Sequence, residues 1–225
     1  MLAAPLLLWV SSFAHATDSR ALRVQMEAPD GWKEISRNEE KQVGTVVIRH
    51  KEIDGAPCLE GTTVASLAPD ALLAASIDIP NQPSWSTWSL PASGKLGSGD
   101  ERFDYYQVLD NPFPIADRAW FLHGRVLRNG AERAFAWEPI DPSTHPTTWA
   151  DVQARFPDAV VTRVNLGDWT FTPQADGTTR IRYRICTDAG GNIPRWAGEY
   201  AATRTLPTNV GDIVREVSRR TRKTP

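Results

Sequence analysis

The chain has 225 residues, of which 41% are hydrophobic and 23% are charged, and this composition is typical of a folded globular domain. Its formal net charge of −2 provides no broad positive surface, which argues against nucleic acid as a partner. The one cluster of basic residues stands at the C-terminus, at Arg219, Arg220, Arg222 and Lys223. It fits the solvated end of a helix, where positive charge complements the dipole, or a tail that docks on a membrane.

The N-terminal segment has the pattern of a secretory signal peptide. An apolar run over residues 2–10 is followed by the small-residue sequence Ala14-His15-Ala16, which is typical of a cleavage site. We therefore expect a signal peptide over residues 1–16, cleavage after Ala16, and a periplasmic or secreted protein whose residues 17–225 form a single domain.

The first predicted elements are a β-hairpin and a short helix. Residues 45–50 are dense in β-branched side chains, and the turn Asp54-Gly55 separates them from a second run over residues 58–66. Pro69 then suits the first position of a helix, which is expected to end before Pro80.

Most of the remaining chain predicts antiparallel strands. Period-two alternation over residues 86–139, with polar turns at residues 97–100 and 129–130, indicates a β-meander. The later elements expected before the C-terminal helix are a helix over residues 148–156 and two strands over residues 160–171 and 178–187.

The last strand and the C-terminal helix have complementary apolar faces. In the strand, Ile181, Tyr183 and Ile185 alternate with arginines, so one face is expected to be apolar and the other water-exposed. After Pro194, apolar residues repeat about every 3.5 positions along a long helix, in which Pro207 predicts a kink. The elements do not alternate between β and α, so the predicted fold class is α+β.

Three segments make the sequence similar to a known family. The most specific is residues 187–196 (TDAGGNIPRW) followed by Leu206-Pro207, and the others are residues 111–118 (NPFPIADR) and Gly167-Asp168-Trp169. In this order they resemble the strand-end Asp-Gly pattern, the Pro-rich turn and the penultimate strand of START (steroidogenic acute regulatory protein-related lipid transfer) domains, which have the helix-grip fold. The likeness covers roughly residues 30–218.

The resemblance implies a curved antiparallel sheet wrapped around the long C-terminal helix, with an internal apolar cavity between them. It further implies a lipid-binding protein, not an enzyme, that sequesters or transfers a single phospholipid, fatty acid or sterol-like molecule. Where animal sterol-binding members place an acidic and a basic residue, this chain has Tyr105 and Gly124. The resemblance therefore does not extend to a sterol-specific polar clamp.

A disulfide is a further implication of the resemblance. In the family, the strand after the first hairpin turn lies antiparallel beside the last strand, which would bring Cys58 opposite Cys186 on the outer face. Two cysteines in a chain sent to an oxidising compartment are compatible with a bridge. The sequence leaves open whether the two residues are bridged.

Aromatic and apolar residues on the inner faces are the candidate ligand contacts. They would equally fill the core without a ligand, so both interpretations stay open. Arg118 lies between apolar inward positions and needs a ligand headgroup or a carboxylate such as Asp117, Asp188 or Asp110. The candidate ligand-binding residues are Trp88, Phe103, Tyr105, Arg118, Trp120, Leu122, Phe135, Trp137, Trp169, Tyr183, Trp196 and Tyr200.

Two other functions stay open beside the lipid carrier. The wider superfamily includes polyketide cyclases and aromatases, but the sequence has no GxSxG, P-loop or HExxH motif, and His123 falls on the outward face. A ligand-free interaction module would instead have a collapsed cavity and an exposed apolar patch. The scattered histidines and the lack of a CxxC pair predict no metal, and no cofactor is expected. We expect a monomer whose partner is a hydrophobic small molecule, with a transient membrane contact left open.

Overall fold

The structure is a computed structural model that describes residues 19–113, 115–188 and 195–223, with the backbone alone for residues 195–202 and 223. The predicted signal peptide over residues 1–16 lies outside the described residues, and so does Pro194. None of the described helices combines the length with the apolar character that crossing a membrane requires.

One large sheet and a long C-terminal helix dominate the described part of the chain. The strands are β1 (Lys33–Glu40), β2 (Gly44–Ile53), β3 (Ala56–Ala65), β4 (Ala92–Leu96), β5 (Arg102–Leu109), β6 (Arg118–Asn129), β7 (Glu132–Pro139), β8 (Val160–Val161), β9 (Asn165–Pro173) and β10 (Thr179–Thr187). The helices are α1 (Ser19–Glu27), α2 (Pro69–Ser76), α3 (Pro146–Arg155) and α4 (Arg195–Lys223), with 3-10 turns η1 (Ile79–Ser84) and η2 (Pro142–Thr144).

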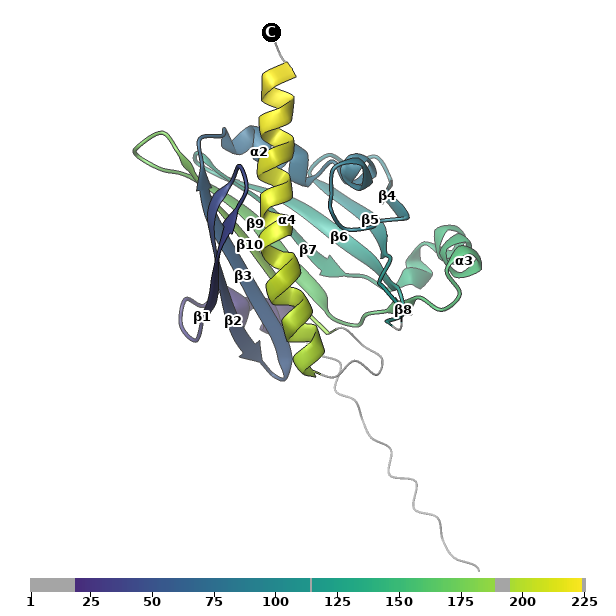
Figure 1. Ribbon diagram of the computed structural model, residues 1–225. Helices are drawn as coiled ribbons and strands as arrows, with labels where there is room; N and C mark the ends of the chain where they lie inside the picture. Colours follow the sequence, from purple (N-terminus) through teal and green to yellow (C-terminus); the bar gives the residue numbers. More distant parts are fainter. Residues whose placement is uncertain (1–18, 114, 189–194, 224–225) are drawn as a thin grey trace, which may run out of the picture.

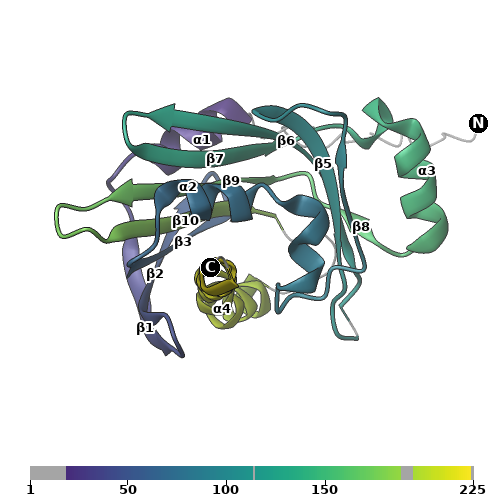
Figure 2. The ribbon, with the colours of Figure 1, turned by 90° about the horizontal axis from the view of Figure 1, so that it is seen from above.

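The sheet curves around α4 (Figures 1 and 2). Its strand order is β1-β2-β3-β10-β9-β7-β6-β5-β4, these neighbours pair antiparallel, and short β8 pairs in parallel with β6. Seen along α4 in Figure 2, the helix lies inside the bend of the sheet. The arrangement confirms the predicted α+β class, a curved antiparallel sheet that wraps around the C-terminal helix.

The concave face is the apolar face, and α4 packs directly on it. Inward side chains alternate along the strands as predicted, for example Ile181 and Tyr183 on β10, which are both buried. Gly61 on β3 permits a close approach of the helix, because a Cβ atom there would lie 2.9 Å from Val210. The buried stripe of α4 consists of Leu206, Val210, Ile213, Val214 and Val217.

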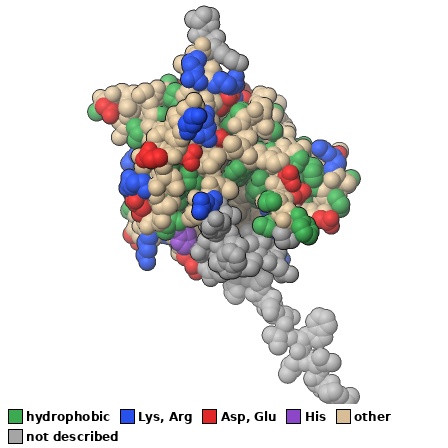
Figure 3. All heavy atoms as spheres, in the orientation of Figure 1, with side chains coloured by type: hydrophobic (Ala, Val, Ile, Leu, Met, Phe, Trp, Pro, Cys, Tyr) green, Lys and Arg blue, Asp and Glu red, His purple; other side chains and the backbone are tan. Residues whose placement is uncertain are grey.

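Ion pairs fix the C-terminal half of α4. Arg220 bonds Glu216 on the same helix at 2.7 Å and Asp78, just after α2, at 2.8 Å. Arg219 also pairs with Glu216. Figure 3 shows Lys and Arg side chains toward this end of the helix. The basic cluster thus anchors α4 in part, beyond the solvated role that the sequence predicts, and the helix continues through Pro207.

The convex face carries a helix that the sequence pattern did not predict. α1 lies on the outer side of the sheet, and its side chains Leu22 and Met26 are buried there. The strand residues that share their cluster are Ile53, Ala56, Cys58, Val164, Leu166 and Cys186. Two apolar side chains four positions apart therefore dock α1 on the sheet.

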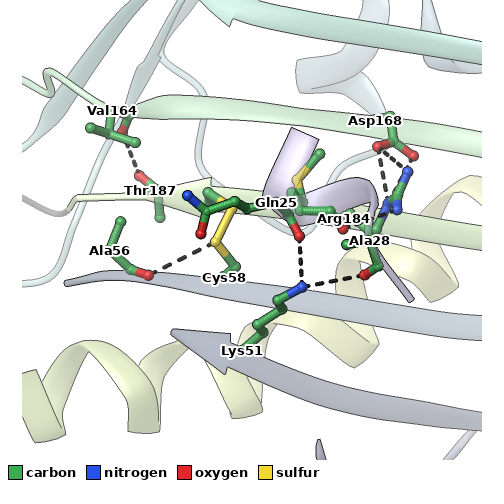
Figure 4. Close-up of a disulfide and its surroundings, with 11 residues drawn as sticks. Gln25, Ala28, Lys51, Ala56, Cys58, Val164, Asp168, Arg184 and Thr187 are labelled. Carbon is green, nitrogen blue, oxygen red and sulfur yellow. Dashed lines mark hydrogen bonds and ion pairs between the residues drawn. A yellow bond between two sulfur atoms is a disulfide. The ribbon is translucent and has the colours of Figure 1, made fainter. Parts of the chain in front are cut away.

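A disulfide joins β3 to β10 within this cluster (Figure 4). Cys58 and Cys186 are direct partners in the antiparallel register. Their Cα atoms are 4.0 Å apart, the Sγ atoms are bonded at 1.99 Å, and the residues are 128 positions apart in the sequence. The pairing agrees with what the resemblance implies.

The arginine face of β10 differs from the prediction. The alternation predicts that it is water-exposed, but Arg184 is only 6% exposed because it lies between α1 and β9. Its Nη2 atom is 2.9 Å from Oδ2 of Asp168, and Nη1 donates to the carbonyl of Met26 at 3.2 Å (Figure 4). A buried cation needs such partners, and α1 supplies one of them.

Two stretches before the meander also differ from the prediction. β1 is an edge strand of mostly charged and polar residues, so it lacks the apolar alternation that identifies a strand. The meander begins at Ala92 and not at residue 86. Residues 77–91 instead form η1 and an irregular stretch, which we call the η1 segment.

Candidate ligand cavity

A small, partly open cavity lies between the concave face and α4, and its lining mixes aromatic with polar side chains, so it differs from the internal apolar cavity that the resemblance implies. Its volume is about 60 Å³. Strands β5, β6, β7, β9 and β10, the η1 segment, α2 and α4 all contribute to its wall. The described lining residues are Ser76, Ile79, Gln82, Ser86, Trp88, Leu90, Tyr105, Gln107, Trp120, Leu122, Phe135, Trp137, Asn165, Trp169, Tyr183, Ile185 and Asn209.

Most of the predicted ligand contacts are brought together here. Those in the lining are Trp88, Tyr105, Trp120, Leu122, Phe135, Trp137, Trp169 and Tyr183. Phe103 lies outside the lining, in the core, with its ring centroid 5.7 Å from that of Phe135. Trp196 and Tyr200 belong to α4, but their side chains lie outside the described residues.

Arg118 is buried at the start of β6 but is not part of the cavity lining. Its Nη1 atom donates to the carbonyls of Ala116 at 2.5 Å and Asp117 at 3.3 Å. Burial lowers the pKa of the guanidinium, whereas the charges of Asp117 and Asp188 act in the opposite direction. These contacts favour protein partners, not a ligand headgroup, as the environment of Arg118.

Aromatic rings form a continuous wall along β7, β9 and β10. The ring centroids of Trp169 and Tyr183 are 4.5 Å apart, those of Trp137 and Tyr183 are 5.6 Å apart, and those of Phe135 and Trp137 are 5.9 Å apart. Gly124 makes room for this wall, because a Cβ atom there would lie 2.7 Å from Phe135. A basic side chain at position 124 would therefore displace Phe135.

Several polar lining residues were not among the predicted contacts. Nε1 of Trp137 donates to Oδ1 of Asn165 at 3.0 Å, and Nε2 of Gln107 donates to Oε1 of Gln82 at 2.6 Å. Gln107 stands opposite Trp120 in the β5–β6 register, so inward parity alone would have identified it. The other polar residues that the prediction missed are Ser76, Ser86 and Asn209.

The two lining tyrosines are neutral phenols at neutral pH. Burial raises the pKa of Tyr105 well above the ordinary value of 10.0. Burial also raises the pKa of Tyr183, although a hydrogen bond with Asn209 acts in the opposite direction. Neither tyrosine therefore brings a negative charge into the cavity, and neither is poised to act as a base near neutral pH.

Two lining tryptophans have no hydrogen-bond acceptor. The Nε1 atoms of Trp88, on the η1 segment, and Trp120, on β6, are shielded from water and have no partner within the described residues. Nε1 of Trp85, also on the η1 segment, is likewise buried without a hydrogen-bond partner in the described part of the chain. A buried donor without an acceptor costs about 1–3 kcal/mol, so these atoms are unusual features of the site.

The η1 segment is attached to α4 at two points, the Asp78–Arg220 ion pair and a buried carboxylate, Asp212. Oδ2 of Asp212 accepts from the backbone N of Thr87 at 2.8 Å and from its hydroxyl at 2.6 Å. Oδ1 of Asp212 accepts from Nη2 of Arg215 at 2.8 Å. Because Asp212 is 2% exposed, this contact holds one wall of the cavity against the helix.

A separate titratable cluster lies on the convex face. Nδ1 of His123 is 2.6 Å from Oδ1 of Asp104, and Nε2 of His145 is 2.8 Å from Oδ2 of the same carboxylate. His123 faces outward, as predicted, yet it is hydrogen-bonded and not simply a solvated surface residue. No group of His, Cys, Asp and Glu in the described part of the chain is arranged to hold a metal ion.

Sequence comparison finds one partial relative. No family model matches the chain. An uncharacterized protein of Pseudomonas aeruginosa is 28% identical over 107 residues, which cover 47% of this chain and 49% of that protein. The chain thus spans about half the length of the curated relative that it matches.

Solved structures match over most of the chain. Human StAR-related lipid transfer protein 5 has a TM-score of 0.70 at 12% identity, covering 89% of this chain and 92% of that one. A STAR-related lipid transfer protein fragment from Xanthomonas axonopodis has a TM-score of 0.68 at 19% identity, covering 84% and 99%. The Zhui aromatase/cyclase from a Streptomyces species has a TM-score of 0.54 at 13% identity, covering 74% and 96%.

These likenesses, together with the sheet that wraps around α4, define the class as a helix-grip protein. Within that class the chain has the START fold, as the sequence resemblance predicts.

Proposed function

We propose that the chain is a non-enzymatic lipid-binding protein that sequesters or transfers a single hydrophobic molecule in the cavity beneath α4. The observation that carries the proposal is the aromatic lining of this cavity, to which five strands contribute. Burying roughly 400 Å² of apolar ligand surface at about 25 cal/mol per Å² would stabilise the complex by about 10 kcal/mol before association costs.

Binding requires the cavity to enlarge. Its volume is about 60 Å³, whereas pockets for small-molecule ligands hold about 300–1,000 Å³. The η1 segment contributes Ile79, Gln82 and Trp88 to the lining. The Thr87–Asp212 contact and the Asp78–Arg220 ion pair fix it to α4. We infer that the η1 segment moves away from α4 when a ligand enters.

The periplasmic or secreted location belongs to the same proposal. The Cys58–Cys186 disulfide supports it, because such bridges persist in oxidising compartments and are rare in the cytosol of most organisms. The signal-peptide pattern over residues 1–16 points to the same compartment.

To transfer a ligand to or from a membrane, the protein would need a transient contact with the bilayer. Phe113, in the loop before β6, is 98% exposed and offers an apolar side chain to a bilayer surface. We expect Phe113→Asp to leave the stability of the protein unchanged and to slow delivery of ligand to vesicles. Equal delivery rates for the variant and the unmodified protein would remove Phe113 from this role.

Two alternatives each have one observation in their favour. The likeness to an aromatase/cyclase favours an enzyme, but the described lining contains no carboxylate, imidazole or thiol to act as acid or base. The small cavity favours an interaction module. Such a module needs a contiguous apolar patch, and the exposed large hydrophobic side chains in the described part are spread over separate segments, namely Val24, Ile35, Val64, Phe113 and Leu127.

Native mass spectrometry tests the proposal against both alternatives. Protein stripped of lipid and then incubated with a mixed lipid extract should acquire the mass of one lipid molecule. Ile185→Trp places an indole in the lining and should reduce uptake, whereas Val64→Trp, at an exposed position, should not. A protein that takes up no lipid from the extract, with both variants behaving alike, would contradict the proposal.

A further inference from the structure

The cavity lining contains no charged residue among those described. None of the described lining residues is Asp, Glu, Lys, Arg or His. Arg118 lies outside the lining and donates to the carbonyls of Ala116 and Asp117. A phosphate or carboxylate in this cavity would lose its hydration without gaining a counter-charge, which is costly in a protein interior. The lining therefore disfavours an ionic group.

The polar groups of the cavity differ between its two sides. On the side formed by β7 and β9, Nε1 of Trp137 donates to Oδ1 of Asn165. On the side formed by β6 and the η1 segment, the indole N–H groups of Trp88 and Trp120 have no acceptor.

The unpaired groups can act only as donors. An indole has one N–H donor and no acceptor, so Trp88 and Trp120 can be satisfied only by an acceptor atom. The amide pair of Gln82 and Gln107, joined at 2.6 Å, still has acceptor lone pairs on its oxygens, but neither indole N–H bonds to it within the described residues. A ligand that displaces the η1 segment is in a position to supply an acceptor instead.

We propose that the ligand is an uncharged hydrophobic molecule that presents acceptor oxygen, as an ester, ketone or ether, to Trp88 and Trp120. This inference rests on the proposed function and narrows its ligand class. The aromatic wall of Phe135, Trp137 and Trp169 takes the hydrocarbon part, and the indole N–H groups fix the oxygen-bearing part. A free fatty-acid anion would place its charge where no cation is available, and a pure hydrocarbon would leave both donors unpaired.

Three probes of similar chain length separate these possibilities. Delipidated full-length mature protein is titrated with methyl oleate, with oleate and with 1-octadecene at about pH 8, where the carboxylate is ionised. We expect methyl oleate to bind about tenfold more tightly than 1-octadecene, as one added hydrogen bond predicts. Oleate is expected to bind more weakly than its ester.

Variants assign the preference to the two tryptophans. Trp88→Phe and Trp120→Phe keep an aromatic ring and remove the N–H donor, so each should lower the ratio of ester affinity to alkene affinity toward one. Trp149→Phe is the matched control, because Trp149 packs on Phe121 outside the cavity lining; it should leave the ratio near that of the unmodified protein. The ratio reports on ligand contacts even where a substitution weakens binding of both probes.

The outcomes distinguish this inference from the proposed function. If the delipidated protein takes up no lipid from the mixed extract and none of the three probes, the lipid-binding proposal itself fails; if it takes up extract lipid but not methyl oleate, only the uncharged-acceptor inference is overturned. If 1-octadecene or oleate binds as tightly as methyl oleate, lipid binding stands but the uncharged-acceptor inference is overturned. The probe comparison needs no variant, so it decides the matter even if a tryptophan substitution prevents folding.

Discussion

The convex and concave faces of the sheet differ in the buried charged and polar groups that they carry. On the convex face, Asp168 pairs with Arg184 and a disulfide joins Cys58 to Cys186, although Nε of Arg23 and Nε of Arg182 are buried there without a partner among the described residues. On the concave face, charge is absent from the described lining, and the N–H groups of Trp88 and Trp120 have no acceptor. The difference between the faces is therefore one of charge: the convex face buries an ion pair and a disulfide, whereas the described lining on the concave face is uncharged.

The largest effect is expected from removing one partner of the buried ion pair on the convex face. Asp168→Ala leaves Arg184 without its carboxylate and should lower the free energy of unfolding by about 3–5 kcal/mol. Urea denaturation measures this change. Glu34→Ala is the control, since the Arg37–Glu34 pair is exposed and should contribute less than about 1 kcal/mol. Equal effects of the two substitutions would contradict the structural role of the buried pair.

Removing the disulfide should have the next largest effect. The double substitution Cys58→Ala and Cys186→Ala releases a constraint between residues 128 positions apart and should cost about 2–4 kcal/mol of stability. Ligand affinity, measured where the variant is still folded, should change little because the bridge lies on the convex face. A large loss of affinity at unchanged stability would show that the two faces are not independent.

On the concave side, the Thr87–Asp212 contact should control exchange of ligand. Asp212→Asn weakens the hydrogen bonds that hold the η1 segment, so ligand release should become severalfold faster and stability should fall by about 1–2 kcal/mol. Stopped-flow displacement of a bound fluorescent lipid measures the rate. Asp151→Asn, in an exposed pair with Arg155, is the control and should alter neither value. Unchanged release from Asp212→Asn would locate the opening elsewhere.

The smallest effect is expected from the outward Asp104 cluster. Burial tends to raise the pKa of Asp104, but hydrogen bonds from His123 and His145 outweigh it and place the pKa below the ordinary value of 3.8. Its contribution to stability is therefore complete above pH 3.8 and is lost as the pH falls through the folded-state value. Asp104→Asn should be less stable than the unmodified protein at about pH 6, and the difference should shrink in strong acid. A constant difference across this range would contradict the assignment.

The concave face could be predicted from the sequence because its signal is repeated. Ile181, Tyr183 and Ile185 alternate along β10, and the stripe of α4 faces them, so two independent patterns indicate the same interior. Trp88 lies in the cavity lining, although it belongs to the η1 segment and not to a strand.

The convex face was harder to predict because its burial depends on tertiary contacts. α1 buries only Leu22 and Met26, which is too weak a pattern to reveal a helix. Because α1 was not predicted, the alternation along β10 led to the prediction that Arg184 is exposed to water. The unpaired state of the Trp88 and Trp120 nitrogens could not be foreseen either, since it depends on where acceptors lie in the folded chain.

A crystal structure of the delipidated protein loaded with methyl oleate tests the central claim most directly. We predict density for one molecule between the concave face and α4, with its ester oxygen within hydrogen-bond distance of Nε1 of Trp88 or Trp120 and the η1 segment shifted away from Asp212. Methyl oleate bound elsewhere on the protein, with the cavity still near 60 Å³, would contradict the account.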